Sequence, residues 1–98
     1  MAKYDVHRLS NGTLVVDCQS DHIRLFETRV VVPLLPRGED AEPVERLQPI
    51  LRVAGEQLIL TTHLLAAVPR AELGRPVTTV AYCSDVIDAA LDMLITGF

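Results

Sequence analysis

Short apolar runs separated by turn residues fill most of the chain, and their spacing favours strands. Residues 3–8 alternate apolar and polar positions, which predicts a strand with Val6 on its buried face and His7 on its exposed face. Residues 29–34 form an unbroken run rich in valine. Such a run is typical of a central strand, which we expect to end near Pro33.

Two turn signals predict hairpins. Asn11-Gly12 favours the positive φ angles of a type I′ turn. Ala54-Gly55 provides a second turn, in which the glycine suits a left-handed position. The strands expected around these turns are residues 3–8, 13–18, 49–53 and 57–62.

The connections can be read from their turn residues. Residues 35–43 contain two prolines, a glycine and three acids, so we expect an exposed loop. Residues 63–69 are interpreted as a short crossover. Gly74 and Pro76 mark a further break, after which residues 77–82 are expected to form a last short strand.

The last segment predicts an amphipathic helix. Ser84 or Asp85 is a suitable N-cap, and acidic residues are favoured near a helix start. Apolar residues recur every three or four positions and form one face, namely Ile87, Ala90, Leu91, Leu94 and Phe98. Three acids, which we expect to lie in solvent, form the other side: Asp85, Asp88 and Asp92.

These elements predict five to seven short, mostly antiparallel strands followed by one terminal helix. The close, regular turns favour a compact barrel or a strongly bent sheet, with the helix covering one face. A chain of 98 residues fits one domain, residues 1–98.

Composition and charge narrow the class of protein. The chain is 49% hydrophobic and 22% charged, as in globular proteins, and its net charge of −4 disfavours broad nucleic-acid binding. It has no apolar run near the roughly 20 residues that cross a bilayer and no signal-peptide pattern, so we expect a cytoplasmic protein without membrane contact. Cys18 and Cys83 are then expected to be reduced packing residues.

No catalytic or metal-binding motif is present, and no cofactor is expected. His7, His22 and His63 lack the local pairing of zinc ligands and are expected to be exposed. There is no nucleophile elbow or glycine-rich phosphate loop, although a catalytic triad can also assemble from distant positions. Thr61 and Thr62 are interpreted as bonding the backbone at a strand end.

The unusual feature that remains is the apolar end, Gly97-Phe98. Glycine lacks a Cβ and lets another surface approach closely. Phe98 can contribute about 1.5–3 kcal/mol if it enters a pocket. This tip either packs on its own fold or is presented to a partner.

With these stretches in view, the chain resembles the CcdB family of toxins from toxin–antitoxin modules along nearly its whole length. The resemblance rests on an ordered set rather than on any single piece. The set comprises DCQSD at 17–21, TRVVVPL at 28–34, Leu47, Pro49, Gly55-Glu56, Thr61-Thr62, Ala67-Val68-Pro69, Gly74 and the final glycine plus an apolar residue.

The resemblance implies a mainly β fold, an SH3-like β-barrel with a small additional sheet and one C-terminal α-helix, assembled as a homodimer. It implies a non-enzymatic toxin that binds the A subunit of DNA gyrase and traps its covalent cleavage complex with DNA. A CcdA-like antitoxin, whose flexible C-terminal segment folds on the toxin, would neutralise it. The toxin–antitoxin complex would repress its own operon through DNA contacts made by the antitoxin. The sequence does not indicate which residues bind the antitoxin.

The resemblance also places the gyrase contacts at paired helix ends and on the loop after residues 17–21. The corresponding residues here are Ile23, Asp92, Ile95, Thr96, Gly97 and Phe98. Thr96 replaces a family tryptophan thought to stack on an arginine, a contact worth about 2 kcal/mol when desolvated. Asp92 replaces an asparagine, Ile95 a phenylalanine and His22 an isoleucine. Our hypothesis is that Phe98 supplies the missing aromatic group.

Two alternatives remain open. A MazF-like endoribonuclease toxin shares this barrel, but it would need RNA contacts and acid–base residues, which the acidic charge balance disfavours. A decayed or retargeted toxin would dimerise and bind antitoxin without poisoning gyrase, and the changes at Thr96 and Asp92 favour it.

Overall fold

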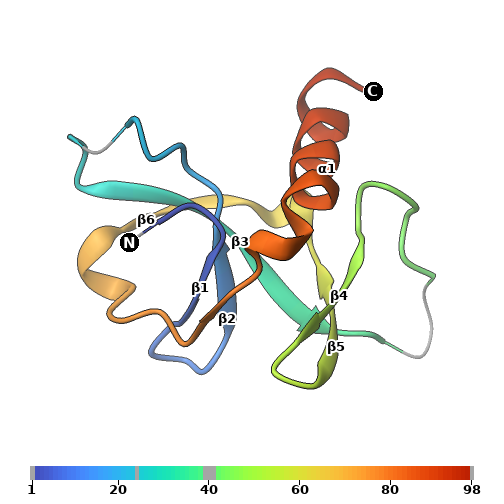
Figure 1. Ribbon diagram of the computed structural model, residues 1–98, viewed down its shortest axis with the longest axis horizontal. Coiled ribbons are helices and arrows are strands. Elements are labelled where there is room, and N and C mark those ends of the chain that lie inside the picture. The colour runs from blue at the N-terminus through green and yellow to red at the C-terminus, as the bar shows by residue number, and fades with distance from the viewer. Residues whose placement is uncertain (1, 24, 39–41, 98) are drawn as a thin grey trace.

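The computed structural model describes residues 2–23, 25–38 and 42–97, which form one curled sheet and a C-terminal helix (Figure 1). The strands are β1 (Asp5–Arg8), β2 (Leu14–Asp17), β3 (Thr28–Pro36), β4 (Ile50–Val53), β5 (Glu56–Leu60), β6 (Ala66–Pro69) and β7 (Thr78–Thr79). The helix α1 spans Ser84–Thr96, and the short 3-10 turns are η1 (Thr62–Leu64), η2 (Arg70–Glu72) and η3 (Ala81–Cys83).

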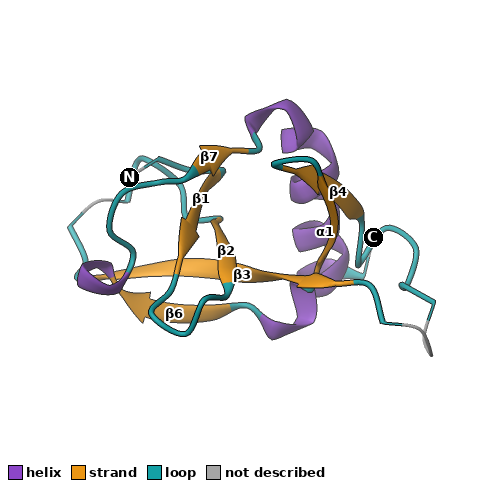
Figure 2. Cartoon of the chain, turned by 90° about the horizontal axis from the view of Figure 1, so that it is seen from below, coloured by secondary structure: helices purple, strands orange, loops and turns teal. Residues whose placement is uncertain are grey.

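The central strand β3 organises the sheet. The strand order is β4-β5-β3-β2-β1-β7, with every pair antiparallel. One edge of β3 pairs with β2, while its other edge pairs first with β6 over residues 28–31 and then with β5 over 34–36. Figure 2 shows the sheet curving round from β7 to β4. The predicted mainly β, SH3-like barrel fold with one C-terminal helix is confirmed, in the form of a curled half-barrel. The small additional sheet of that prediction is not separate among the described residues, because all their strands belong to one sheet.

The predicted end of this strand near Pro33 is wrong, since β3 continues to Pro36 and takes two residues from the expected loop 35–43. Pro33 lies where the outer edge of β3 passes from β6 to β5, so no strand there requires its missing N–H. Its carbonyl accepts bonds from Thr61 N at 3.0 Å and Thr61 Oγ1 at 2.7 Å. The predicted backbone role of Thr61 is confirmed, and Thr62 Oγ1 likewise donates to Leu60 O at 3.4 Å.

Three further boundaries differ from the sequence prediction. Residues 66–69 form strand β6 rather than a crossover, because they pair with the first half of β3. The expected strand over 77–82 is limited to β7, and its remainder forms η3. Because η3 runs directly into α1, the helix starts at Ser84 and its N-cap position is Cys83, not Ser84 or Asp85.

Both predicted hairpins form, but the first has a different turn. Gly12 has a φ of 91° and donates its N–H to Leu9 O at 2.9 Å, whereas Asn11 lacks the positive φ that a type I′ turn requires. In the second hairpin, Ala54 at 52° and Gly55 at 82° both have positive φ, as a type I′ turn does require.

Two apolar clusters lie against the sheet. The larger cluster includes residues of α1 and comprises Val6, Val16, Cys18, Val32, Leu34, Leu51, Val53, Leu58, Leu60, Val80, Ile87 and Ala90. The smaller cluster comprises Val15, Val31 and Leu73. His7 is fully buried with its Nδ1 3.1 Å from Leu73 O, so the expectation that it is exposed is wrong. The segment that carries Leu73 covers this face of β1. His22 and His63 are exposed as expected.

A side chain links the two ends of the curled sheet. Tyr82 of η3 donates its hydroxyl to the carbonyl of Arg52 in β4. Among the described residues, η3 and β4 are therefore joined by a side-chain contact and not by strand pairing.

The packing of the two cysteines gives a first prediction. Cys18 is buried and Cys83 packs partly buried against the same cluster, as expected. Burial raises the pKa of the Cys18 thiol to about 12, and the negative charge of Asp17 adds to this rise. We expect a thiol-specific reagent at neutral pH to modify Cys83 and to reach Cys18 only after denaturation. Fast modification of native Cys83→Ser protein would contradict this burial.

Candidate functional site

The last two turns of α1 and its C-cap residue carry four of the predicted contact residues. The buried residues of the helix, Ile87 and Ala90, lie in its first half. From residue 91 onwards no residue of α1 is buried, although most are apolar. Ile95 is 71% exposed. Figure 1 shows this half of the helix standing clear of the sheet, so an apolar end is presented to solvent.

The backbone at this helix end is well defined. Gly97 has a left-handed φ of 83° and donates its N–H to Met93 O at 3.0 Å, which ends the helix. Thr96 Oγ1 donates to Asp92 O at 2.6 Å, so its hydroxyl is used within the helix. Asp92, Ile95, Thr96 and Gly97 are therefore brought together, all exposed, around one turn.

The other two predicted contact residues do not join this turn. Phe98 lies outside the described residues, and its role stays a prediction. Ile23 is 46% exposed on the loop between β2 and β3. Figures 1 and 2 place that loop at the opposite end of the molecule from the C-terminal end of α1. Within one chain, the loop that carries Ile23 and the C-terminal end of α1 are therefore separate parts of the molecule.

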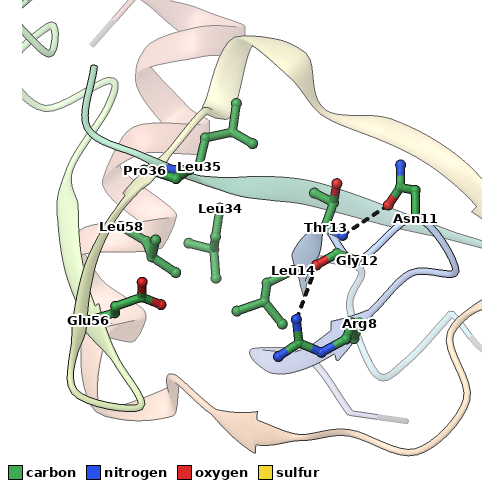
Figure 3. Close-up of a pocket in the computed structure, with 10 residues that line it drawn as sticks. All are labelled: Arg8, Asn11, Gly12, Thr13, Leu14, Leu34, Leu35, Pro36, Glu56 and Leu58. Atoms are coloured by element: carbon green, nitrogen blue, oxygen red, sulfur yellow. Dashed lines mark hydrogen bonds between the residues drawn. The ribbon is translucent and has the colours of Figure 1, made fainter. Parts of the chain in front are cut away.

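A groove on the half-barrel is concave, whereas the end of α1 projects from the fold. Its volume is about 380 Å³, and it lies between the β1–β2 turn, the end of β3 and the start of β5. Figure 3 shows Leu14, Leu34 and Leu58 pointing toward one another, with Arg8 and Glu56 on either side. This groove could not be predicted from the sequence, because its lining residues come from separate segments that only the fold brings together.

The comparison with protein families decides the class of the chain. The family model described as CcdB protein matches residues 3–97. This chain belongs to the CcdB family. It is therefore classed with the toxins of toxin–antitoxin modules, and an antitoxin is the general partner that this membership implies.

Two of the segments on which the resemblance to the CcdB family rests are joined by a buried ion pair in the structure. Asp17 of DCQSD and Arg29 of TRVVVPL form a buried ion pair, in which Arg29 Nε donates to Oδ2 at 2.8 Å and Nη2 to Oδ1 at 2.9 Å. This pair was not predicted from the sequence. The available signal was an arginine and an aspartate each flanking a run of buried valines, where an unpaired charge would be costly.

The rest of DCQSD holds the loop that carries Ile23. Gln19 Nε2 donates to Ile23 O at 2.8 Å, while Gln19 Oε1 accepts from Val30 N at 3.1 Å. Ile23 N donates to Ser20 O at 3.0 Å, and Arg29 Nη2 reaches Gln19 O at 3.3 Å. The loop is thus fixed at its base by side chains as well as by backbone.

A polar cluster fixes the first half of α1. Tyr4 OH donates to Asp88 Oδ1 at 2.9 Å and Oδ2 at 2.8 Å, and Lys3 Nζ lies 3.2 Å from Oδ1. The expectation that Asp88 lies in solvent holds only in part, because its side chain is 45% exposed but is bonded by Tyr4 and Lys3 of the N-terminal segment. Asp85 and Asp92 are exposed as expected.

The same cluster changes the proton affinity of two side chains. Burial raises the pKa of Tyr4, and its hydrogen bond to Asp88 raises it further. Burial acts to lower the pKa of Lys3, but its interactions with Asp88 and Tyr4 outweigh this and raise it. Both shifts favour the protonated forms that bind Asp88, so this attachment of α1 is maintained up to alkaline pH.

The described residues contain neither a metal-binding cluster nor a membrane-spanning helix. Across 2–23, 25–38 and 42–97, no three His, Cys, Asp or Glu side chains gather to hold a metal ion. Each helix in this part of the chain is too short or too polar to span a bilayer.

Proposed function

We propose that this chain is a toxin that binds the A subunit of DNA gyrase through the end of α1 and traps the cleavage complex of the enzyme with DNA. The observation that carries this proposal is the apolar helix end, in which none of the residues 91–97 is buried and Ile95 is 71% exposed. The toxin acts by binding, and its own side chains make and break no covalent bond.

We further propose that the toxin is a homodimer with its two helix ends side by side. Leu91, Met93 and Leu94 are only partly buried in one chain. A second copy can cover part of this apolar surface through an isologous contact, in which the same patch is used by both copies. Paired ends also present two copies of Ile95 and Gly97 to one target.

A retargeted toxin is the second candidate, and the state of Thr96 favours it. Its hydroxyl is bonded within the helix, and no large ring stands at this position. The neighbouring Asp92 adds an exposed negative charge to the surface that meets the target. These features remove an aromatic contact and change the charge that a partner encounters.

The test is a supercoiling and DNA-cleavage assay with purified gyrase, with and without ATP. The proposed toxin inhibits supercoiling and increases the covalent gyrase–DNA complex. A dimer that binds antitoxin and leaves both readouts unchanged would favour the retargeted toxin. Incubation with mRNA in parallel tests the ribonuclease alternative, for which we expect intact RNA.

We propose that the flexible segment of the antitoxin lies in the groove between Arg8 and Glu56. A disordered segment needs a concave surface in which to order, and this groove has an apolar floor and one charge of each sign at its sides. We therefore expect the segment to carry apolar residues with an acidic residue toward Arg8 and a basic residue toward Glu56.

Charge reversal at the groove gives a second prediction. The Arg8→Glu variant should bind an antitoxin C-terminal peptide about 5- to 10-fold more weakly, since the groove then carries two negative charges. Isothermal titration calorimetry measures the affinity. Arg75→Glu, an equal change at an exposed position outside the groove, is the matched control. Equal weakening in both variants would mean that only net charge matters.

A further inference from the structure

The turn between β1 and β2 carries the one asparagine of the chain, Asn11, and a glycine follows it. Both residues are exposed. Asparagine is among the chemically labile residues of proteins, because the backbone nitrogen of the next residue can attack its side-chain amide. A following glycine favours this attack, since it has no side chain to hinder it. The pair Asn11-Gly12 is therefore a candidate site of spontaneous modification.

The turn holds the Asn11 side chain in a conformation that suits this reaction. Its Oδ1 accepts a hydrogen bond from Thr13 N at 2.9 Å, which folds the side chain over the Gly12 peptide (Figure 3). The same donor lies where negative charge develops on Oδ1 during the attack, so it stabilises the transition state. A Cβ added to Gly12 would meet no atom within 4 Å, so the space beside Gly12 is open.

Two neighbours of Gly12 act on the attacking nitrogen in opposite directions. Arg8 Nη1 donates to Gly12 O at 3.1 Å, and its positive charge favours the loss of the Gly12 N–H proton that precedes the attack. The Gly12 N–H also donates to Leu9 O at 2.9 Å, and this bond must break first. Because a protein hydrogen bond is only modestly stronger than its exchange with water, breaking it slows the reaction by about fivefold. The fold therefore delays the reaction without preventing it.

We propose that Asn11 deamidates in the folded toxin and that the product weakens neutralisation by the antitoxin. The deprotonated Gly12 N forms a bond to Cγ of Asn11, the Cγ–Nδ2 bond breaks, and Nδ2 takes up a proton and leaves as ammonia. Water then opens the resulting five-membered imide at either carbonyl, which gives an aspartate or an isoaspartate. One amide and one water thus become one carboxylic acid and one ammonia, and the acid is ionised at neutral pH.

The new carboxylate lies at the groove proposed for the antitoxin segment, since Arg8, Asn11 and Gly12 all line it. Arg8 is expected to meet an acidic residue of that segment. A carboxylate on the same turn competes for Arg8 and repels that acidic residue. An aged toxin thus evades its antitoxin, while the end of α1 lies outside the lining of the groove and is unchanged. This consequence rests on the proposed function, whereas the reaction itself does not.

The reaction is measured by mass spectrometry of the full-length toxin, incubated at mildly alkaline pH and digested at successive times. We expect the fragment that contains residue 11 to gain the mass difference between an amide and an acid, about fivefold more slowly than in toxin unfolded in urea. The Asn11→Ser variant is the control, since it keeps a side-chain oxygen in the turn and has no amide to lose. A folded toxin that reacts about 100-fold more slowly than the unfolded one would overturn the inference.

The consequence is measured by isothermal titration calorimetry with a synthetic peptide that carries the C-terminal segment of the cognate antitoxin. We expect aged toxin and the Asn11→Asp variant to bind about three- to fivefold more weakly than fresh toxin, and Asn11→Ser to bind like fresh toxin. If Arg8→Glu weakens binding but Asn11→Asp does not, the groove stands and its regulation by deamidation is wrong. If neither variant weakens binding, the proposed groove is wrong and its regulation fails with it, while the mass change alone decides the reaction.

Discussion

Replacing Arg29 with methionine is expected to lower the free energy of unfolding by about 3–5 kcal/mol. The change leaves the carboxylate of Asp17, which is 0% exposed, without the guanidinium that donates two hydrogen bonds to it. A small domain has a total stability of about 5–15 kcal/mol, so this loss is a large part of it. Urea unfolding followed by circular dichroism measures the change.

Two further variants make this prediction specific. Arg52→Met, at an exposed position of β4, should change stability by no more than about 0.5 kcal/mol. The double variant Asp17→Leu with Arg29→Met should be more stable than Arg29→Met alone, because no buried charge is then left unpaired. If Arg29→Met unfolds like Arg52→Met, the ion pair does not stabilise the fold.

Removing residues 97 and 98 should abolish growth arrest when the toxin is expressed without antitoxin, and should lower gyrase inhibition by about 100-fold or more. The deletion removes the glycine whose N–H bonds Met93 O and which ends the helix next to Ile95. None of the residues 91–97 is buried, so the fold should keep most of its stability. Growth assays and supercoiling inhibition measure the effect.

The control for this deletion is Val44→Asp, which changes an exposed apolar residue outside α1 and should leave toxicity intact. The melting temperature and the dimer mass of the shortened protein must match those of the parent. A shortened toxin that meets both conditions and still arrests growth would show that the helix end does not act on the target.

Local pattern was sufficient to predict much of the fold. The hairpins, the valine-rich central strand and the terminal helix each carry their signal within a few neighbouring residues. Long-range placement was not predictable in this way. The local sequence of residues 66–69 indicated a connection, but these residues pair with β3 and form a strand. The local pattern around His7 indicated an exposed side chain, but the segment that carries Leu73 covers it. Pairings between distant segments decide such cases, and periodicity does not report them.

The candidate site, too, could be predicted from the sequence only in part. The exposed helix end follows from the sequence, since its apolar residues continue past the part of α1 that the sheet can cover. The distance between Ile23 and that end depends on the direction in which the β2–β3 loop leaves the sheet, which one sequence does not give. The family resemblance supplied the residues of both, but not their separation.

The shared strand β3 has a consequence for how the molecule denatures. It pairs with β2, β5 and β6, so without it the β2–β1–β7 strands, the β4–β5 hairpin and β6 are no longer joined in one sheet. Loss of β3 separates these parts at once, which favours a single cooperative transition without a stable half-folded species. A protease would then meet this toxin either intact or as an extended chain.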